Sequence, residues 1–416
     1  MQSLSVFRHR AYCHYFVMRN LFTGSRQMIA VAIGWQVYEI ARETRSIEES
    51  AFILGLIGLA QFLPILILFL IAGQAADRVD RKIILIACNI VKVGALCLLL
   101  IASHFASGVA LALMFSAAVV MGIANSFAPS AATSLYPLLV PREDLPNAVS
   151  WNLIGFQTAA ILGPAIAGGL FLISVNAVYL VAIAMLIVST IAIATARTPT
   201  HQPKSDVKAL TLIREGFDYL RSRPRVSGAI LLDFVVVFFS GATALLPIFA
   251  RDILHVGPEG LGLLRAAPAV GAVIVGYALA AYPLLRRIGF WLLLSVALTG
   301  VSMLVFGLSS VFWVSLVALA GYGGADMMSV YIRQSLIQLT TPEHLRGRVA
   351  AVSFLFVSGS NELGEFESGV VARFLGPVGA VMLGGVVAIV TAVAWIKIFP
   401  TLAKTNRLDD GGPPLS

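Results

Sequence analysis

Long apolar stretches, separated by short polar segments, follow one another along almost the whole chain. A helix needs about 20 apolar residues to span the hydrocarbon core of a bilayer. On that measure we expect an all-α protein that crosses a membrane about twelve times. The predicted crossings are residues 12–38, 51–74, 82–104, 108–134, 146–172, 174–196, 227–250, 259–284, 288–308, 311–338, 347–371 and 375–398.

Basic residues are distributed unevenly between the two sets of loops that these crossings define. Most of the 29 Lys and Arg residues fall in one set of loops and chain ends. The opposite set holds only Arg42, Arg45, Arg251 and Arg373. Because cytoplasmic loops of membrane proteins carry the excess of Lys and Arg, both termini are expected on the cytoplasmic side. That orientation requires an even number of crossings.

The chain also repeats itself at a nearly constant spacing. Gly58 and Pro64 recur 204 residues later as Gly262 and Pro268. A second set recurs 201 residues later, where Gly122, Ala124, Ser134, Leu135, Leu138 and Pro141 match Gly323, Ala325, Ser335, Leu336, Leu339 and Pro342. Such repeats are typical of transporters built from two halves. We therefore expect two pseudo-symmetric bundles of six helices each.

This duplication predicts the organisation of the chain. The predicted parts are an N-terminal bundle (1–196), a cytoplasmic linker (197–226), a C-terminal bundle (227–400) and a C-terminal tail (401–416). Within the linker, apolar residues recur at helical spacing, at Leu210, Ile213, Phe217 and Leu220. The pattern predicts a short amphipathic helix at the membrane surface that tethers the two halves.

Composition excludes several classes of protein. Hydrophobic residues make up 58% of the chain and charged residues 12%, whereas about a quarter of a soluble domain is charged. The net charge of +8 is spread between apolar segments, so it does not form the basic face that a nucleic acid requires. The sequence holds no phosphate-binding loop and no cluster of residues at metal-ligand spacing. We expect no enzymatic activity, no cofactor, no metal and no nucleic-acid partner.

The polar segment after the second crossing holds the most specific motif. It reads Gly73-x-x-x-Asp77-Arg78-x-x-Arg81-Lys82 and resembles the motif that joins the second and third helices of major facilitator superfamily transporters. The resemblance covers nearly the whole chain and implies that this segment is a conformational latch. A carboxylate near a helix end can accept charge-assisted hydrogen bonds in one state and release them in the other. Ala75 and Asp80 depart from the Leu and Gly that are commonest in the motif.

A second motif lies in the fifth crossing, which contains Gly163, Pro164 and Gly168. Proline kinks a helix and glycine permits close helix packing. The segment is similar to the Gly-Pro motif of antiporters in this superfamily, although the spacing differs. Two interpretations stay open, a hinge between the halves or simple tight packing.

Ionisable residues inside a membrane are costly and indicate function by default. In the major facilitator fold that the resemblance implies, the first, fourth, seventh and tenth helices line a central cavity. Candidates for contact with a substrate are His14, Arg19, Arg26, Gln27, Asn125 and Arg333. Candidates for carrying a proton are Asp233 and Asp326, and the internal repeat equates Asp326 with Asn125.

The eleventh crossing adds an acidic segment that contains Glu362, Glu365 and Glu367. Glu362 and Glu365 are three residues apart and so share a helix face. Two close carboxylates in a low dielectric cannot both ionise cheaply, so one is expected to exchange a proton. The alternative is that Glu365 and Glu367 are solvated near the outer surface or paired with Arg265 or Arg373.

Within the superfamily, the chain is most similar to the branch of enterobactin exporters and macrolide-efflux proteins. The turn at residues 141–145 and the segment at residues 342–348 carry this resemblance together with the latch motif. It implies a monomeric secondary transporter in a bacterial inner membrane, among lipids, that exports an amphipathic small molecule in exchange for protons. A departure is the fourth crossing, which lacks the Arg found there in many drug/proton antiporters.

Two other functions stay open. The first is an uncoupled or proton-symporting carrier, or an importer, for an anionic or lipid-like molecule that Arg19 and Arg26 bind. The second is a membrane receptor or scaffold that transports nothing.

Overall fold

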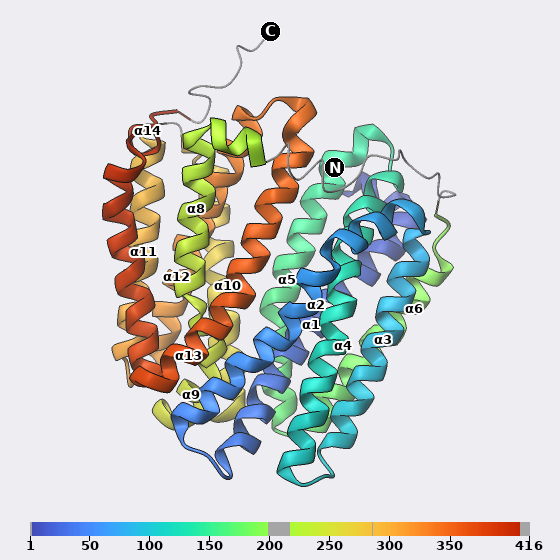
Figure 1. Ribbon diagram of the computed structural model, residues 1–416. Coiled ribbons are helices and arrows are strands. Elements are labelled where there is room, and N and C mark those ends of the chain that lie inside the picture. Colours follow the sequence, from blue (N-terminus) through green and yellow to red (C-terminus); the bar gives the residue numbers. More distant parts are fainter. Residues whose placement is uncertain (1, 199–216, 285, 408–416) are drawn as a thin grey trace. The chain divides into compact units, whose positions relative to one another are not determined.

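The computed structural model describes residues 2–198, 217–284 and 286–407, and these form helices joined by short connections (Figure 1). Among the described residues, nine helices are long and apolar enough to cross a membrane. The chain forms two compact units. Unit 1 comprises Met1–Ser46, Ile57–Asp206 and Gly257–Ala266, and unit 2 comprises Ile47–Leu56, Val207–Val256 and Ala267–Ser416.

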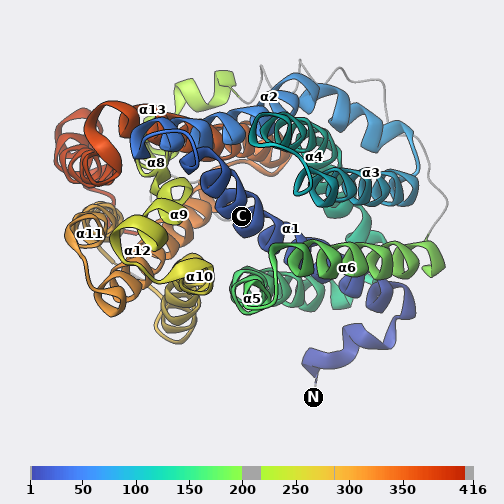
Figure 2. The same ribbon diagram turned by 90° about the horizontal axis from the view of Figure 1, so that it is seen from below.

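Unit 1 is built from long helices that pack side by side. Its elements are η1 (Gln2–Arg8), α1 (Arg10–Arg42), α3 (Arg81–Ala102), α4 (Ser107–Leu135), η2 (Tyr136–Leu138), η3 (Arg142–Asp144), α5 (Leu145–Phe171) and α6 (Val175–Thr195). Helix α1 packs against α5 and α6, and α3 packs along α4 and α6. Figure 2 views these helices nearly end-on and shows α3 beside α4.

Unit 2 repeats this construction with more irregular helices. Its elements are α8 (Pro224–Phe239), η4 (Gly241–Leu245), α9 (Leu246–Ile248), the π-helix η5 (Phe249–Ile253), α11 (Ile288–Leu308), α12 (Phe312–Thr340), α13 (Glu343–Ile398) and α14 (Pro400–Ala403). Helix α11 packs against α12 and α13, and α13 packs against α8.

Helices α2 (Ile47–Arg78) and α10 (Gly257–Ala281) are each divided between the units. Within unit 2, a Cβ on Gly55 of α2 would lie 3.0 Å from the Cα of Gly369 on α13. Within unit 1, a Cβ on Gly262 of α10 would lie 2.8 Å from the Cα of Gly168 on α5. In both places the first turns of a helix approach a neighbouring backbone because neither helix has a side chain there.

The internal repeat corresponds to equivalent packing in the two units. In unit 1, Gly122 of α4 lies against the backbone of Gln61 on α2. In unit 2, Gly323 of α12 lies against the backbone of Pro268 on α10. Gly122 and Gly323 correspond to each other in the internal repeat. Gly122 of α4 contacts α2, and Gly323 of α12 contacts α10. The repeated glycines therefore mark a close helix crossing that occurs once in each unit.

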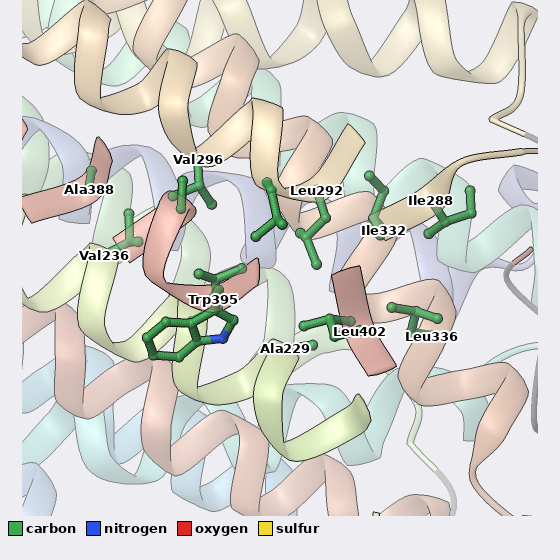
Figure 3. Packing of buried hydrophobic residues seen from close by; sticks show 13 residues of the cluster. Ala229, Val236, Ile288, Leu292, Val296, Ile332, Leu336, Ala388, Trp395 and Leu402 are labelled. Carbon is green, nitrogen blue, oxygen red and sulfur yellow. The ribbon is translucent and has the colours of Figure 1, made fainter. Parts of the chain in front are cut away.

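The core of unit 2 illustrates how these helices are held together. Trp395 of α13 is 9% exposed and packs among Ala229 and Val236 of α8 and Leu292 and Val296 of α11 (Figure 3). The indole Nε1–H of Trp395 donates a hydrogen bond of 2.9 Å to the carbonyl oxygen of Gly228. The large ring is thus buried with its polar atom satisfied.

Most predicted crossings agree with the observed helices to within a few residues, for example 174–196 with α6 and 288–308 with α11. The crossing predicted at 227–250 agrees with a candidate span over Pro224–Ile253, but this span is not one regular helix, because α8 ends at Phe239 and gives way to η4, α9 and a π-helix. The crossings predicted at 347–371 and 375–398 lie in α13, which is kinked at Gly376 (φ 73°).

Most of the predicted linker, including Leu210 and Ile213, lies outside the described residues. Residues 217–222 are helical. Leu220 is 5% exposed and packs with Val226 and Ile230 of α8 and with Val349 of α13. The end of the linker is therefore anchored to unit 2 by apolar contacts.

Candidate functional site

The structure brings two of the predicted site residues together inside unit 2. Asp233 of α8 and Arg333 of α12 form an ion pair between Oδ1 and Nη1. Their side chains are only 6% and 4% exposed. Removal of either partner would leave an uncompensated buried charge, which is strongly destabilising. Any mechanism that changes the charge of Asp233 therefore also affects Arg333, and the reverse.

Asp326 lies on the same helix as Arg333, seven residues earlier. Seven residues are about two helical turns, or about 10 Å along the axis. Asp326 is half-buried and lies on the α12 face that carries Arg333. Unit 2 thus places two carboxylates and one guanidinium along one side of α12.

The acidic segment of α13 packs against the end of α8. Glu362 and Glu365 are both half-buried. Between them, a Cβ on Gly364 would lie 2.7 Å from the carbonyl oxygen of Phe238 and 2.9 Å from that of Val237. Gly364 therefore allows the acidic segment to approach the last turn of the helix that carries Asp233. Glu367, the third acid of the segment, accepts a hydrogen bond of 3.5 Å from the hydroxyl of Ser368.

In unit 1, the predicted substrate-contacting residues lie on α1 and α4. His14, Arg19 and Gln27 are half-buried, Arg26 is exposed, and Asn125 of α4 is half-buried. Arg19 and Arg26 are seven residues apart on one face of α1. The Nδ1 atom of His14 is buried without a hydrogen-bond partner in the described part of the chain. Helix α1 thus carries two cations and one unsatisfied imidazole along its length.

Sequence reasoning assigned no role to Lys92, which the structure places beside these residues. Lys92 of α3 is 2% exposed, and its Nζ lies 3.6 Å from the centroid of the Phe22 ring on α1. One turn earlier on α3, Asn89 Nδ2 donates a hydrogen bond of 3.0 Å to Ser189 Oγ on α6. The sequence feature that could have identified Lys92 is its position in the middle of the apolar segment at residues 82–104.

The predicted latch motif, Gly73 to Lys82, begins within the C-terminal end of helix α2. Helix α2 ends at Arg78, which is exposed, and a Cβ on Gly73 would meet nothing within 4 Å. The side chain of Asp77 lies outside the described part of the structure. Asp80, which departs from the commonest residue of the motif, is the N-cap of α3. Its carboxylate accepts a hydrogen bond of 2.8 Å from the backbone N–H of Lys82.

Lys82, the last residue of the motif, contacts the C-terminal end of helix α6. The ammonium of Lys82 donates a hydrogen bond of 2.9 Å to the carbonyl oxygen of Ala196, the C-cap of α6. A cation at this end of a helix is favoured by the helix dipole. Arg81 is half-buried, and its Nε has no hydrogen-bond partner among the described residues. Lys82 thus joins the start of α3 to the C-cap of α6, directly before the predicted linker.

The glycines predicted as a hinge are tightly packed in unit 1. A Cβ on Gly163 would lie 2.7 Å from the Cβ of Gln27 and 3.0 Å from the carbonyl oxygen of Gly24, both on α1. Gly168 packs on the start of α10, where a Cβ would lie 2.9 Å from the carbonyl oxygen of Glu259. Pro164 lies between them inside α5. These contacts give each glycine a packing role.

No group of three or more His, Cys, Asp or Glu residues could hold a metal ion within the ranges that the structure describes. The buried charges of unit 2 include the ion pair of Asp233 and Arg333, which lies among apolar helices. This arrangement suits the binding of charged or polar groups from a ligand.

Comparison with known proteins gives a match over nearly the whole chain. The family described as transmembrane secretion effector matches residues 2–410. The enterobactin exporter EntS of Citrobacter koseri is 26% identical over 394 residues, which cover 93% of this chain and 87% of the exporter. The Escherichia coli protein of the same name has the same identity and coverage.

Solved structures of similar fold include membrane transporters. A D-xylose–proton symporter superposes with a TM-score of 0.70 at 13% identity, over 95% of this chain and 100% of the symporter. A bacterial homologue of the iron transporter ferroportin, in its inward-facing state, gives a TM-score of 0.68 at 14% identity. That match covers 95% of this chain and 99% of the homologue. At these identities the likeness shows the fold.

Proposed function

The chain belongs to the transmembrane secretion effector family of the major facilitator superfamily, and we propose that it exports an amphipathic small molecule in exchange for protons. The observation that carries this proposal is the match to enterobactin exporters over 93% of the chain. The substrate is proposed to be siderophore-like or drug-like. Alternating access would expose it first to the cytoplasm and then to the outer face of a bacterial inner membrane.

The proposal includes twelve crossings with both termini in the cytoplasm. Nine helices of the described residues have the length and apolar character of a span. Helices α1 and α12, of 33 and 29 residues, are long enough but carry charged residues along their length. Helix α13 has 56 residues, about 84 Å at 1.5 Å per residue, which is far more than one crossing of about 30 Å. Division of α13 at Gly376, together with α1 and α12, supports a total of twelve.

The bundles proposed to move are residues 1–196 and 227–400, with 197–226 as the tether and 401–416 as a tail. Gly73, Asp77, Arg78, Arg81 and Lys82 are proposed as the latch. The bond from Lys82 to Ala196 supports a role for this segment at the border of the first bundle. Gly163, Pro164 and Gly168 are proposed as the hinge. The whole protein is proposed to work as a monomer among membrane lipids.

Proton coupling is proposed to use the ion pair of unit 2. Protonation of Asp233 would remove the negative charge that compensates Arg333, so Arg333 would be released to another anion. Asp326 on the same side of α12 is one internal acceptor for that guanidinium. Glu362 and Glu365, packed against the end of α8 through Gly364, are proposed to pass the proton. Substrate contacts are proposed at His14, Arg19, Arg26, Gln27, Asn125 and Arg333.

The composition of the helices that carry these residues supports an amphipathic substrate. Isolated charges among apolar side chains suit a molecule with an apolar body and few polar groups. A sugar or peptide carrier would need many more hydrogen-bonding groups, since each polar group left unpaired on binding costs affinity.

Accumulation in everted inner-membrane vesicles tests the proposed direction and substrate class. Vesicles from cells that produce the protein would be compared with vesicles from cells that do not, with iron-free enterobactin and erythromycin as probes. We expect protein-dependent accumulation of at least one probe, abolished by a protonophore. Accumulation in right-side-out vesicles instead would show an importer. Folded protein that binds a probe but moves it in neither preparation would contradict transport.

A further inference from the structure

The segment that follows α13 is packed on the start of helix α11 in unit 2. Leu402 of α14 is 1% exposed and lies in one apolar cluster with Ile288 and Leu292 of α11 (Figure 3). A Cβ on Gly289 would clash with the carbonyl oxygens of Leu402 and Ala403. The glycine therefore allows the chain after α13 to lie directly against the first turn of α11.

Hydrogen bonds hold the same contact. The backbone N–H of Gly289 donates a hydrogen bond of 2.9 Å to the carbonyl oxygen of Thr405, and the backbone N–H of Arg287 donates one of 3.0 Å to Asn406 Oδ1. Arg287 has a φ of 57°, a conformation that is uncommon for residues other than glycine. Because these backbone N–H groups are already bonded within the protein, side chains are the groups left there to bind a ligand.

Three cations lie at this contact. Arg286 and Arg287 directly precede α11, and Lys404 lies two residues before Asn406, which limits the distance between their Cα atoms to about 7 Å. All three side chains are exposed, and none forms an ion pair with a side chain that the structure describes. Residues 281–308 and 397–407 contain no Asp or Glu. The contact therefore presents concentrated positive charge to its surroundings.

The helices that contact α14 are α8, α11 and α13, and they supply no acid near this end. The acid of α8 is Asp233, nine residues after its first residue Pro224, or about 14 Å along the axis. The last acid of α13 is Glu367, thirty residues before Lys397, or about 45 Å. An anion that binds the three cations must therefore come from another molecule or from the chain beyond residue 407.

An apolar stripe on α11 leads away from these cations. Its exposed members share one helix face because they follow one another at intervals of eight, three, four and three residues. They are Phe290, Leu298, Val301, Val305 and Leu308. Helix α11 is long and apolar enough to cross a membrane, so this face suits contact with acyl chains. Cations at one end of an apolar stripe match the chemistry of a phospholipid with an anionic headgroup.

We propose that Arg286, Arg287 and Lys404 bind the headgroup of an anionic phospholipid whose acyl chains lie along the exposed face of α11. Lys and Arg residues at the membrane surface attract anionic lipids. A zwitterionic lipid has no net charge and gains less from the three cations. Free phosphate lacks the acyl chains, whose burial contributes to the affinity of a lipid. The site concerns the surrounding membrane and goes beyond the transported substrate.

Thermal unfolding of the purified protein in detergent tests this site. Dioleoylphosphatidylglycerol and dioleoylphosphatidylcholine have the same acyl chains and differ in headgroup charge, and a bound lipid raises the unfolding temperature by mass action. We expect phosphatidylglycerol to act at lower concentration on the wild type. Arg286→Gln/Arg287→Asn/Lys404→Gln should weaken its binding about a hundredfold, about fivefold for each cation. Asparagine is chosen at position 287 because it tolerates a positive φ.

Arg10→Gln/Arg142→Gln/Arg197→Gln is the matched control, because it removes three exposed cations from unit 1 and should keep the preference for phosphatidylglycerol. If the triple variant of unit 2 does not fold, Lys404→Gln alone must weaken phosphatidylglycerol binding about fivefold. Equal action of the two lipids on the wild type would overturn the site, as would a preference that survives the substitutions in unit 2.

Two further arms identify the occupant. Inorganic phosphate should not raise the unfolding temperature at the concentrations at which phosphatidylglycerol does, and an equal rise would overturn the lipid as the ligand. Asp409→Asn/Asp410→Asn removes the two acids of the chain beyond residue 407 and should keep the preference of the wild type. A preference that appears only in this variant would assign the three cations to the chain's own end and overturn the proposal.

Discussion

Asp233 and Arg333 form an ion pair inside unit 2, between α8 and α12, with side chains that are 6% and 4% exposed. The pair joins a residue expected to carry a proton to one expected to contact substrate. One protonation event can therefore change the charge available to a ligand. Both residues lie in unit 2, so the proposed coupling would be local to that unit.

Loss of one partner of this pair should destabilise the protein more than loss of both. Asp233→Asn leaves Arg333 buried and uncompensated, which we expect to cost about 3–5 kcal/mol of unfolding free energy. The double variant Asp233→Asn/Arg333→Gln should recover much of that loss. Chemical unfolding of the single and double variants in detergent measures both values. A single variant as stable as the wild type would show that the pair is not held in the folded protein.

The two glycines Gly163 and Gly169 of α5 should respond in opposite ways to alanine. A methyl group at Gly163 meets Gln27 at 2.7 Å, whereas at Gly169 it meets nothing within 4 Å. Gly163→Ala should lower the unfolding temperature, since overpacking costs about 1–3 kcal/mol. Gly169→Ala should keep or raise it, because alanine favours a helix by about 1 kcal/mol over glycine. Equal tolerance at both positions would contradict the packing of α5 against α1.

Lys82 should stabilise the last turn of α6. Lys82→Met removes the hydrogen bond to Ala196, a loss of about 0.5–1.5 kcal/mol. Hydrogen exchange of the amides of residues 193–196 should become faster, and Lys82→Arg should restore most of the protection. If exchange in that turn is the same in all three proteins, the capping bond is absent in solution.

The N-terminal segment should be held in place by Asp144. His9 Nε2 and Ser5 Oγ lie 2.8 Å and 2.5 Å from the two carboxylate oxygens of Asp144, and the ring of Phe7 packs 5.0 Å from that of Trp151. Asp144→Asn should speed hydrogen exchange in η1, with Ser5→Ala giving a smaller effect. Unchanged exchange in Asp144→Asn would contradict an anchoring role for Asp144.

The sequence was sufficient for the parts of the fold that depend on local pattern. Stretches of uniform apolar character such as 174–196 and 288–308 predicted α6 and α11 closely. The interruption of the seventh crossing could not be predicted, because it depends on a contact between distant segments. Gly241 begins η4 where it meets the backbone of Gly364 on α13, and nothing within residues 227–250 reveals that partner.

The candidate site shows the same division. Intramembrane charges such as Asp233 and Arg333 are conspicuous in the sequence, but their pairing depends on the rotation of α8 and α12 about their axes. Lys92 was visible as a charge in an apolar segment, but its place over Phe22 depends on how α3 packs against its neighbours. The periodicity of the sequence predicts which residues share one face of a helix. It does not predict which neighbouring helix that face contacts.

Proton movement during transport tests the central claim most directly. Everted vesicles would be acidified inside by respiration and monitored with a fluorescent pH probe, while a transported substrate is added outside. We predict that the substrate enters as protons leave, so the interior becomes less acidic, and that Glu362→Gln or Asp233→Asn abolishes this response. Substrate accumulation that proceeds with no change in internal pH, and equally well in both variants, would contradict proton-coupled export.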